Sequence, residues 1–221
     1  MKNYFNGYKY AKILMDAIIY TILIWVVIFL LVYDNAIVYD VSMQPTLNAT
    51  SGVSDNDMVC YNKLEKYGIS DIVIVKVDDE LIVKRVIAVG GDKIRYVYDN
   101  NSGVYDLYIN NQKIVEEYIK EDITLDGLIN SNNSIKFADI TDESGYNPFA
   151  LLKRNEPENF DEDGNYVIPK DMFFAMGDNR IYSTDSKSHG AYSNSSVVGV
   201  VDLIIYHDDN AFLKILDFMF W

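Results

Sequence analysis

A hydroxyl that could act as a nucleophile stands at Ser42, in the turn sequence Ser-Met-Gln-Pro-Thr-Leu of residues 42–47. Pro45 fixes its own φ and biases Gln44 toward an extended conformation, so the geometry of this turn is restricted. Most exposed turn serines are only turn residues. The hexapeptide alone therefore leaves both interpretations open.

Lys84 could supply the base that such a serine needs. It stands inside the apolar run Leu-Ile-Val-Lys-Arg-Val-Ile of residues 81–87. A lysine acts as a general base only when neutral, and an apolar environment lowers its pKa from about 10.4. Serine with lysine is a known variant of the nucleophile and base pair. The alternative is an edge-strand lysine that discourages pairing between sheets.

A third polar segment, residues 176–190, carries turn formers, hydroxyls, carboxylates and cations between two expected strands. A plain hairpin loop would have a similar composition. However, a buried neutral lysine needs a hydroxyl to orient it, and an aspartate paired with a cation can make the supporting loop rigid.

Other reactive side chains receive no catalytic role. Cys60 is the only cysteine and stands in an apolar stretch, which favours a buried hydrophobe and excludes an internal disulfide. A Ser-His-Asp triad is weakened because the chain has only His189 and His207 and no Gly-x-Ser-x-Gly sequence. Residues 159–165 imitate the start of a calcium loop, but Lys170 stands where a bidentate glutamate is needed.

Residues 13–33 are apolar except for Asp16 and are long enough to cross a bilayer, which predicts a transmembrane helix. No small-x-small cleavage site follows, which argues against a removable signal. Lys2, Lys9 and Lys12 precede the span, so we expect a cytoplasmic tail over residues 1–12 and an outer domain over residues 34–221.

The outer domain is predicted to be mainly antiparallel β, because short β-branched and aromatic runs alternate with turn signals. The expected strands are 71–77, 81–89, 93–98, 104–109, 171–176 and 197–206. Residues 119–165 are polar and irregular and are predicted to be an inserted cap. Residues 211–221 are apolar but too short for a second span, and could lie against the domain or the membrane surface.

Composition narrows the function classes. The chain of 221 residues has a formal net charge of -14, which makes a nucleic-acid-binding protein improbable. Hydrophobic residues make up 49% of the chain, which excludes a disordered protein.

Taken together and in this order, the segments resemble type I signal peptidases, which are membrane-anchored Ser-Lys proteases. The resemblance covers nearly the whole chain. Its segments are the anchor and residues 42–47, 70–75, 84–92, 108–111, 167–170 and 177–187. Each motif is modest, but their joint order is highly specific.

The resemblance implies a role for each matching residue. Ser42 would be the nucleophile and Lys84 the general base, with Met43 packed beside the scissile bond. Ser183 would hydrogen-bond Lys84. Two ion pairs would brace the loop: Arg85 with Asp178, and Asp185 with Lys187.

The sequence departs from the family pattern at three positions. Lys187 replaces the usual arginine and loses its bidentate fork. Asp40 stands two residues before the nucleophile, where the family has glycine or serine. We expect its side chain to turn away and leave the backbone N–H of Ser42 as the main oxyanion donor. His189 replaces an aromatic residue, and we expect it to have a packing role.

The resemblance implies a signal peptidase in the cell membrane that needs no metal or organic cofactor and binds no nucleic acid. Its partners would be the lipid bilayer and tethered preproteins with small-x-small cleavage sites. The main alternative is a non-catalytic, signal-peptidase-like assembly factor for surface fibres, which Asp40 favours. A ligand-binding anchored β domain would explain the strands but not the three motifs.

Overall fold

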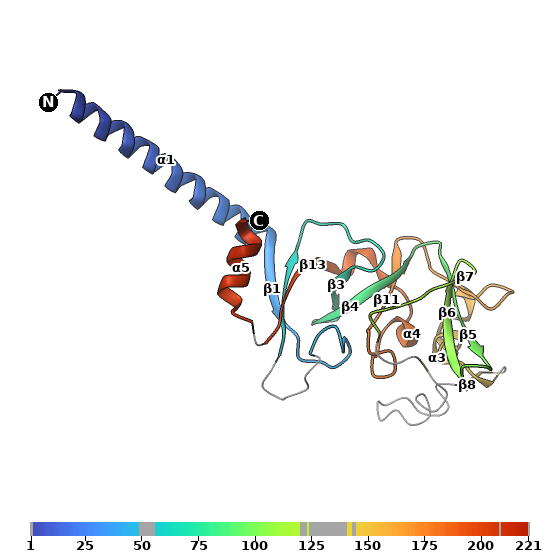
Figure 1. Cartoon of the computed structure of the whole chain (residues 1–221). Coiled ribbons are helices and arrows are strands. Elements are labelled where there is room, and N and C mark those ends of the chain that lie inside the picture. Colours follow the sequence, from blue (N-terminus) through green and yellow to red (C-terminus); the bar gives the residue numbers. More distant parts are fainter. Residues whose placement is uncertain are drawn as a thin grey trace.

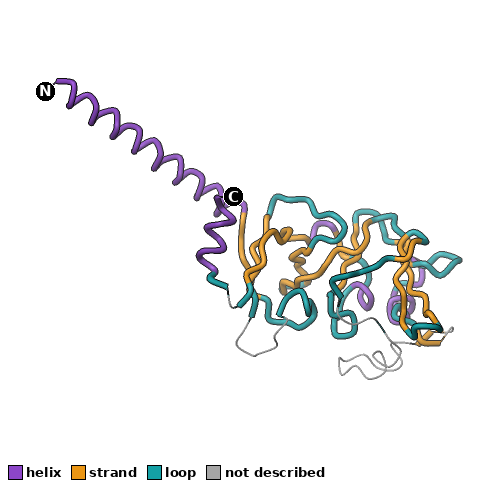
Figure 2. Tube along the Cα trace, in the orientation of Figure 1, coloured by secondary structure: helices purple, strands orange, loops and turns teal. Residues whose placement is uncertain are grey.

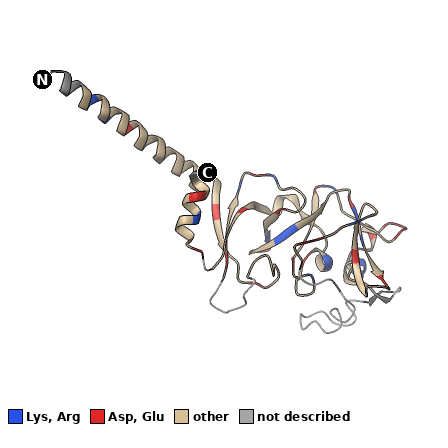
Figure 3. Ribbon diagram, in the orientation of Figure 1, with Lys and Arg blue, Asp and Glu red and all other residues tan. Residues whose placement is uncertain are grey.

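The computed structural model describes residues 2–48, 56–119, 123, 141–142, 145–207 and 209–220. A long N-terminal helix, α1 (Lys2–Val32), projects from a β-rich body, and a short C-terminal helix, α5 (Ala211–Phe220), lies beside its end (Figure 1). Residues 7–32 of α1 form a helix that is long enough and apolar enough to cross a membrane. Charged residues are sparse on α1 and frequent on the body (Figure 3).

A seven-stranded sheet forms the part of the body nearest α1. Its strand order is β1-β2-β13-β3-β4-β11-β12, and every neighbouring pair is antiparallel. The strands are β1 (Tyr33–Ile37), β2 (Met58–Asn62), β3 (Ile72–Val77), β4 (Glu80–Val89), β11 (Met172–Met176), β12 (Tyr192–Ser193) and β13 (Val197–Ile205).

A second sheet lies at the far end of the body, in the order β10-β5-β6-β7 (Figures 1 and 2). Its strands are β5 (Lys93–Asp99), β6 (Val104–Ile109), β7 (Gln112–Lys113) and β10 (Tyr166–Val167). Gly91, with a φ of 95°, lies in the turn between β4 and β5. That positive φ favours glycine, so this residue lets the chain pass from one sheet to the other.

Short elements complete the body. They are the hairpin β8 (Thr141–Asp142) and β9 (Gly145–Tyr146), the helices α3 (Ala150–Asn155) and α4 (Ser186–His189), and the 3-10 turns η2 (Pro157–Asn159) and η3 (Asn194–Ser196).

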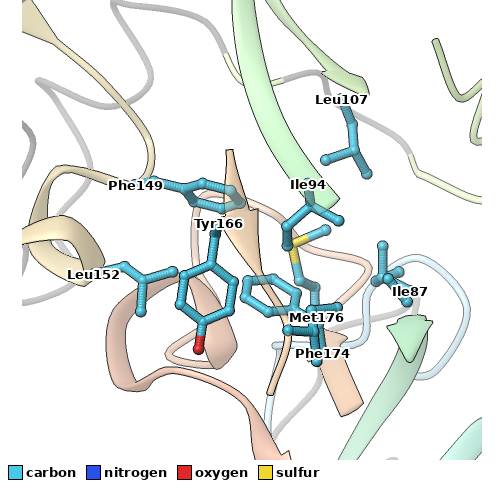
Figure 4. Close-up of a cluster of buried hydrophobic side chains, with 10 residues drawn as sticks. Ile87, Ile94, Leu107, Phe149, Leu152, Tyr166, Phe174 and Met176 are labelled. Atoms are coloured by element: carbon cyan, nitrogen blue, oxygen red, sulfur yellow. The ribbon is translucent and has the colours of Figure 1, made fainter. Parts of the chain in front are cut away.

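The largest hydrophobic cluster joins the two sheets. Phe174 and Met176 come from β11 of the first sheet, and Ile94 and Tyr166 come from the second (Figure 4). Phe149, beside α3, packs against Phe174 with ring centroids 5.6 Å apart. Burial of this apolar surface fixes the second sheet relative to β4 and β11 of the first.

The predicted fold class is confirmed: an apolar N-terminal helix precedes a body of antiparallel sheets. The helix is longer than the predicted span, because it starts at Lys2. Strands β1 and β2 were not predicted. Of the predicted cap over residues 119–165, residues 120–122, 124–140 and 143–144 lie outside the described residues, and Phe149 and Leu152 within it are core residues.

Candidate active site

Ser42 lies in a tight turn that follows β1. The backbone N–H of Leu47 donates to the Met43 carbonyl over 3.0 Å, and both side chains are fully buried in a cluster with Val59. Met43 and Leu47 therefore hold the turn against the sheet. Ser42 itself is only 3% exposed.

Asn48 and Asp57 clamp the chain around this turn, and sequence reasoning missed both. Asn48 Nδ2 donates to the carbonyls of Val38 and Asp40, over 2.7 and 3.1 Å. Asn48 and Asp57 also exchange two backbone-to-side-chain hydrogen bonds of 2.6 and 2.8 Å. Both side chains are buried, so these bonds fix the path of the segment that leads to Ser42.

Lys84 lies in β4 with its ammonium group directed at Ser42. Its Nζ donates to Ser42 Oγ over 2.8 Å, and the residue is 3% exposed. Burial lowers the pKa of Lys84, although the carboxylates of Asp185, Asp40 and Asp178 act in the opposite direction. The structure thus brings together the two residues that sequence analysis assigned to chemistry, in a geometry that permits proton transfer.

The polar loop after β11 packs directly on the turn of Ser42. The backbone N–H of Asn179 donates to the Ser42 carbonyl over 3.0 Å, and Asn179 Nδ2 donates to the Val41 carbonyl over 3.2 Å. A Cβ at Gly177 would collide with both the Ser42 carbonyl oxygen and Ser183 Oγ. Only glycine therefore allows the loop to approach the turn this closely.

Arg85 and Asp178 form the first predicted ion pair. Arg85 donates from Nε and Nη2 to the two oxygens of Asp178, over 2.9 and 2.6 Å. Thr46 Oγ1 donates to the same carboxylate over 2.5 Å. This bidentate pair therefore links strand β4, the turn of Ser42 and the polar loop.

Asp185 and Lys187 form the second predicted pair. Lys187 Nζ lies 2.9 and 2.7 Å from the two oxygens of Asp185, whose Oδ2 also accepts from the Gly177 N–H. Burial raises the pKa of Asp185, but the Lys187 ammonium, together with Ser183 and the Gly177 N–H, outweighs burial and holds that pKa below its usual value. Lys187 thus contacts both oxygens as a point charge.

Ser183 is buried beside Gly177, but the predicted bond to Lys84 is not formed in this structure. Its Oγ has no hydrogen-bond partner among the described residues. The hydroxyl nevertheless acts on the neighbouring Asp185 carboxylate, whose pKa it helps to lower.

A third charged cluster was not predicted. Arg180 forms an ion pair with both oxygens of Glu116. Glu116 lies in the exit loop of the second sheet, which is the segment of residues 114–119 after β7. The Tyr118 ring lies 4.0 Å from the Arg85 guanidinium and 5.8 Å from that of Arg180. Glu116 and Tyr118 therefore connect the exit loop of the second sheet to the polar loop. No sequence signal marked these two residues.

Three further residues that the sequence analysis discussed lie outside this network. Asp40 is exposed, and its Oδ1 accepts from the Val41 N–H over 2.7 Å. Cys60 is buried in β2. His189 is exposed at the end of α4.

Comparison with known proteins gives concordant matches. Residues 11–206 match the family described as signal peptidase, peptidase S26. Signal peptidase I P of Bacillus subtilis subsp. natto is 29% identical over 91% of this chain and 90% of its own length. Signal peptidase IB of Staphylococcus aureus strain COL is 32% identical over 72% of this chain and 71% of its own.

One solved structure, a signal peptidase I from Enterococcus faecalis V583, matches at 24% identity and a TM-score of 0.38. It covers 62% of this chain and 97% of that one. The family match spans both Ser42 and Lys84 and most of the remaining chain. The chain therefore belongs to the signal peptidase family, peptidase S26.

Proposed function

We propose that the chain is a membrane-anchored signal peptidase that cleaves preproteins with Ser42 as nucleophile and Lys84 as general base. The observation that carries the proposal is the 2.8 Å contact between Lys84 Nζ and Ser42 Oγ in a buried site. No carboxylate lies in hydrogen-bond contact with Lys84 among the bonds of the described residues, whereas burial lowers its pKa. A neutral lysine at this position can accept a proton.

The reaction proceeds in two stages. Lys84 takes the proton of Ser42 as Oγ attacks the scissile carbonyl carbon, and then gives that proton to the leaving amine when the C–N bond breaks. The signal peptide remains as an ester on Ser42. Lys84 next removes a proton from water, which attacks the ester, and the proton returns to Ser42 Oγ as the acid product leaves.

The oxyanion that forms in each stage needs a donor, and the backbone N–H of Ser42 is the proposed one. Asp40 supports this assignment, because its carboxylate turns to the Val41 N–H and to solvent. The carboxylate therefore does not stand in hydrogen-bond contact with the reacting hydroxyl. It still acts on Lys84 through its charge.

The substrate is proposed to bind as an added strand along β4. Residues 80–85 of β4 pair with β3, whereas β11 pairs with β4 only from Arg85 onward. Within the described chain, the other edge of residues 80–84 has no strand partner. An extended preprotein could occupy this edge and pair main chain to main chain. The resemblance to signal peptidases implies small residues at the first and third positions before the cut.

Helix α1 is proposed to be a single membrane anchor with its N-terminus in the cytoplasm and the catalytic domain outside. Most of its apolar residues are exposed, which suits lipid contact. Its charged residues other than Asp16 lie at the N-terminal end, at Lys2, Lys9 and Lys12, and favour this orientation. The anchor would confine enzyme and tethered preprotein to the same bilayer and raise their effective concentration.

The test is cleavage of a preprotein with an Ala-x-Ala site by purified full-length chain in detergent, with the new N-terminus sequenced. We expect Ser42→Ala and Lys84→Met each to lower kcat by at least about 10³-fold. The matched controls are Ser195→Ala and Lys76→Met at exposed positions, which should cleave like the wild type.

A preprotein with a bulky residue directly before the cut should not be cleaved. Cleavage by Lys84→Met would remove the dyad from the mechanism. No cleavage by the folded wild type would instead favour the non-catalytic assembly factor and direct attention to Asp40.

A further inference from the structure

Helix α5 packs against the outer end of α1. Trp25 Nε1 of α1 donates to the Met219 carbonyl of α5 over 3.1 Å. The Phe218 ring lies 6.1 Å from that of Phe29 and 5.2 Å from that of Tyr33, both edge to face. The last turn of α5 is therefore attached to the part of α1 proposed to lie in the outer half of the bilayer.

The apolar surface of α5 is wider than this contact. At about 100° per residue, Ile215, Phe218 and Met219 share one face, and they are all half-buried. The adjacent face carries Phe212 and Leu213, which are 69% and 56% exposed. Lys214 and Asp217 form a narrow charged stripe on the remaining side of the helix.

The depth of α5 follows from its contact with Trp25. Trp25 lies seven residues before Val32, the last residue of α1, or about 10 Å along the helix axis from its end. Phe212 lies seven residues before Met219, so it can be at most about 10 Å further out than that contact. The exposed face of α5 therefore lies no further out than about the outer end of α1.

We propose that α5 is an interfacial helix whose Phe212 and Leu213 face inserts into the lipid bilayer beside α1. The proposal rests on the proposed anchoring by α1. Helix α5 has the composition of interfacial helices, with one apolar arc and a narrow charged stripe. Exposed apolar groups are stabilised by about 25 cal/mol per Å² when they leave water, and hydrocarbon supplies that burial here.

The inserted helix gives the catalytic domain a second attachment. Helix α1 runs directly into β1, and β13 leads to α5 through residues 206–210. Strands β1 and β13 flank β2 in the same sheet. One edge of the catalytic sheet is thus held to the bilayer at two neighbouring points, which limits the tilt of Ser42 relative to the membrane surface.

Spin-label accessibility in phospholipid vesicles tests this proposal. The chain carries Cys60→Ala, so that a single new cysteine takes the nitroxide, and Ser42→Ala, so that the result does not depend on cleavage. Labels at Phe212→Cys and Leu213→Cys should collide more often with oxygen, which concentrates in lipid, than with a water-soluble nickel chelate. We expect the ratio of the collision rate with oxygen to the collision rate with the nickel chelate to be several-fold higher than at the control positions.

The matched control on the same helix is Asp217→Cys, and the control in water is Val115→Cys, which is 79% exposed on the distant body. Ratios at 212 and 213 equal to that at 115 would overturn the inserted helix. A label at Leu23→Cys on α1 reports the anchor independently. An aqueous ratio there would overturn both the anchor and the proposal, whereas a lipid ratio at 23 alone would overturn only the role of α5.

Discussion

Two buried lysines lie close to the same loop and differ in their partners. Lys84 is 3% exposed and Lys187 is 6% exposed, so water solvates neither ammonium well. Lys187 contacts both oxygens of Asp185. Lys84 contacts the neutral hydroxyl of Ser42.

This difference in contact partners indicates which buried lysine can act as a general base. A buried ammonium in contact with a carboxylate braces the structure, because each charge offsets part of the other's loss of hydration. Burial lowers the pKa of both lysines, but at Lys187 the contacting Asp185 carboxylate opposes this effect by charge and by hydrogen bonds, whereas Lys84 contacts only a hydroxyl. Burial is common to both sites, and the partner decides the role.

The same substitution should therefore have opposite effects at the two positions. Arginine keeps the positive charge but cannot lose its proton in a protein. We expect Lys84→Arg to lower kcat by at least about 10³-fold, since the general base is lost. Lys187→Arg should retain activity within a few-fold, because a guanidinium can bind Asp185 through two parallel hydrogen bonds. Steady-state cleavage of one preprotein by both variants measures the contrast.

Equal losses in the two variants, with both proteins folded, would show that charge and size matter at each lysine in the same way. The proposed division between base and brace would then be wrong. Thermal unfolding of both variants serves as the folding control.

The free energy of unfolding should separate the two sites as well. Asp185→Asn leaves Lys187 as a buried charge without its partner, which costs about 3–5 kcal/mol. Lys84→Met should leave the protein equally or more stable, because it removes an ammonium whose burial is not offset by a direct carboxylate contact. Thermal and chemical unfolding in detergent measure both changes.

The pH dependence follows from the sign of the Lys84 shift. Its pKa is lower in the folded chain than the ordinary value of 10.5, so the charged form opposes folding at neutral pH. That penalty disappears as the pH rises toward the ordinary value. The stability gain of Lys84→Met should therefore shrink between neutral pH and about pH 10.5. A constant gain over this range would point to packing instead of charge.

Sequence reasoning reached the parts of the site that local pattern determines. Lys84 was recognisable because a lysine inside a β-branched run must face either an edge or a desolvated partner. Arg85 with Asp178 and Asp185 with Lys187 were placed through the family resemblance, and both pairs are present in the structure. The main strands were marked by their composition and by the turns between them.

The missed parts depend on contacts that no local pattern records. Glu116 and Arg180 are far apart in the chain and meet only because β5 and β6 fold against β11. Strand β1 follows the anchor without a break in a sequence that contains Asp34 and Asn35, both unfavourable in strands. Pairing with β2 overrides that preference, and tertiary context of this kind is invisible in a single sequence.

The smallest expected effect concerns Asp40, which acts on Lys84 by charge alone. Its carboxylate favours the charged form of Lys84 and so raises the pKa of that lysine, against the larger effect of burial. Asp40→Asn removes the charge and keeps an oxygen that can accept from the Val41 N–H. Lys84 should then lose its proton at a lower pH, and the acidic limb of kcat/KM should move to lower pH.

The exposed Asp79 provides the matched control, because Asp79→Asn removes the same charge from the turn between β3 and β4. It should leave the limb unchanged. Since Asp40 is exposed, salt should reduce the shift that Asp40→Asn causes.

The value of kcat/KM on the plateau of the pH profile is a separate readout, because Lys84 is already neutral at those pH values. A higher plateau in Asp40→Asn would mean that the carboxylate also opposes the oxyanion, whereas a shifted limb at constant height would assign its whole effect to Lys84. An unmoved limb would contradict the coupling between Asp40 and the base.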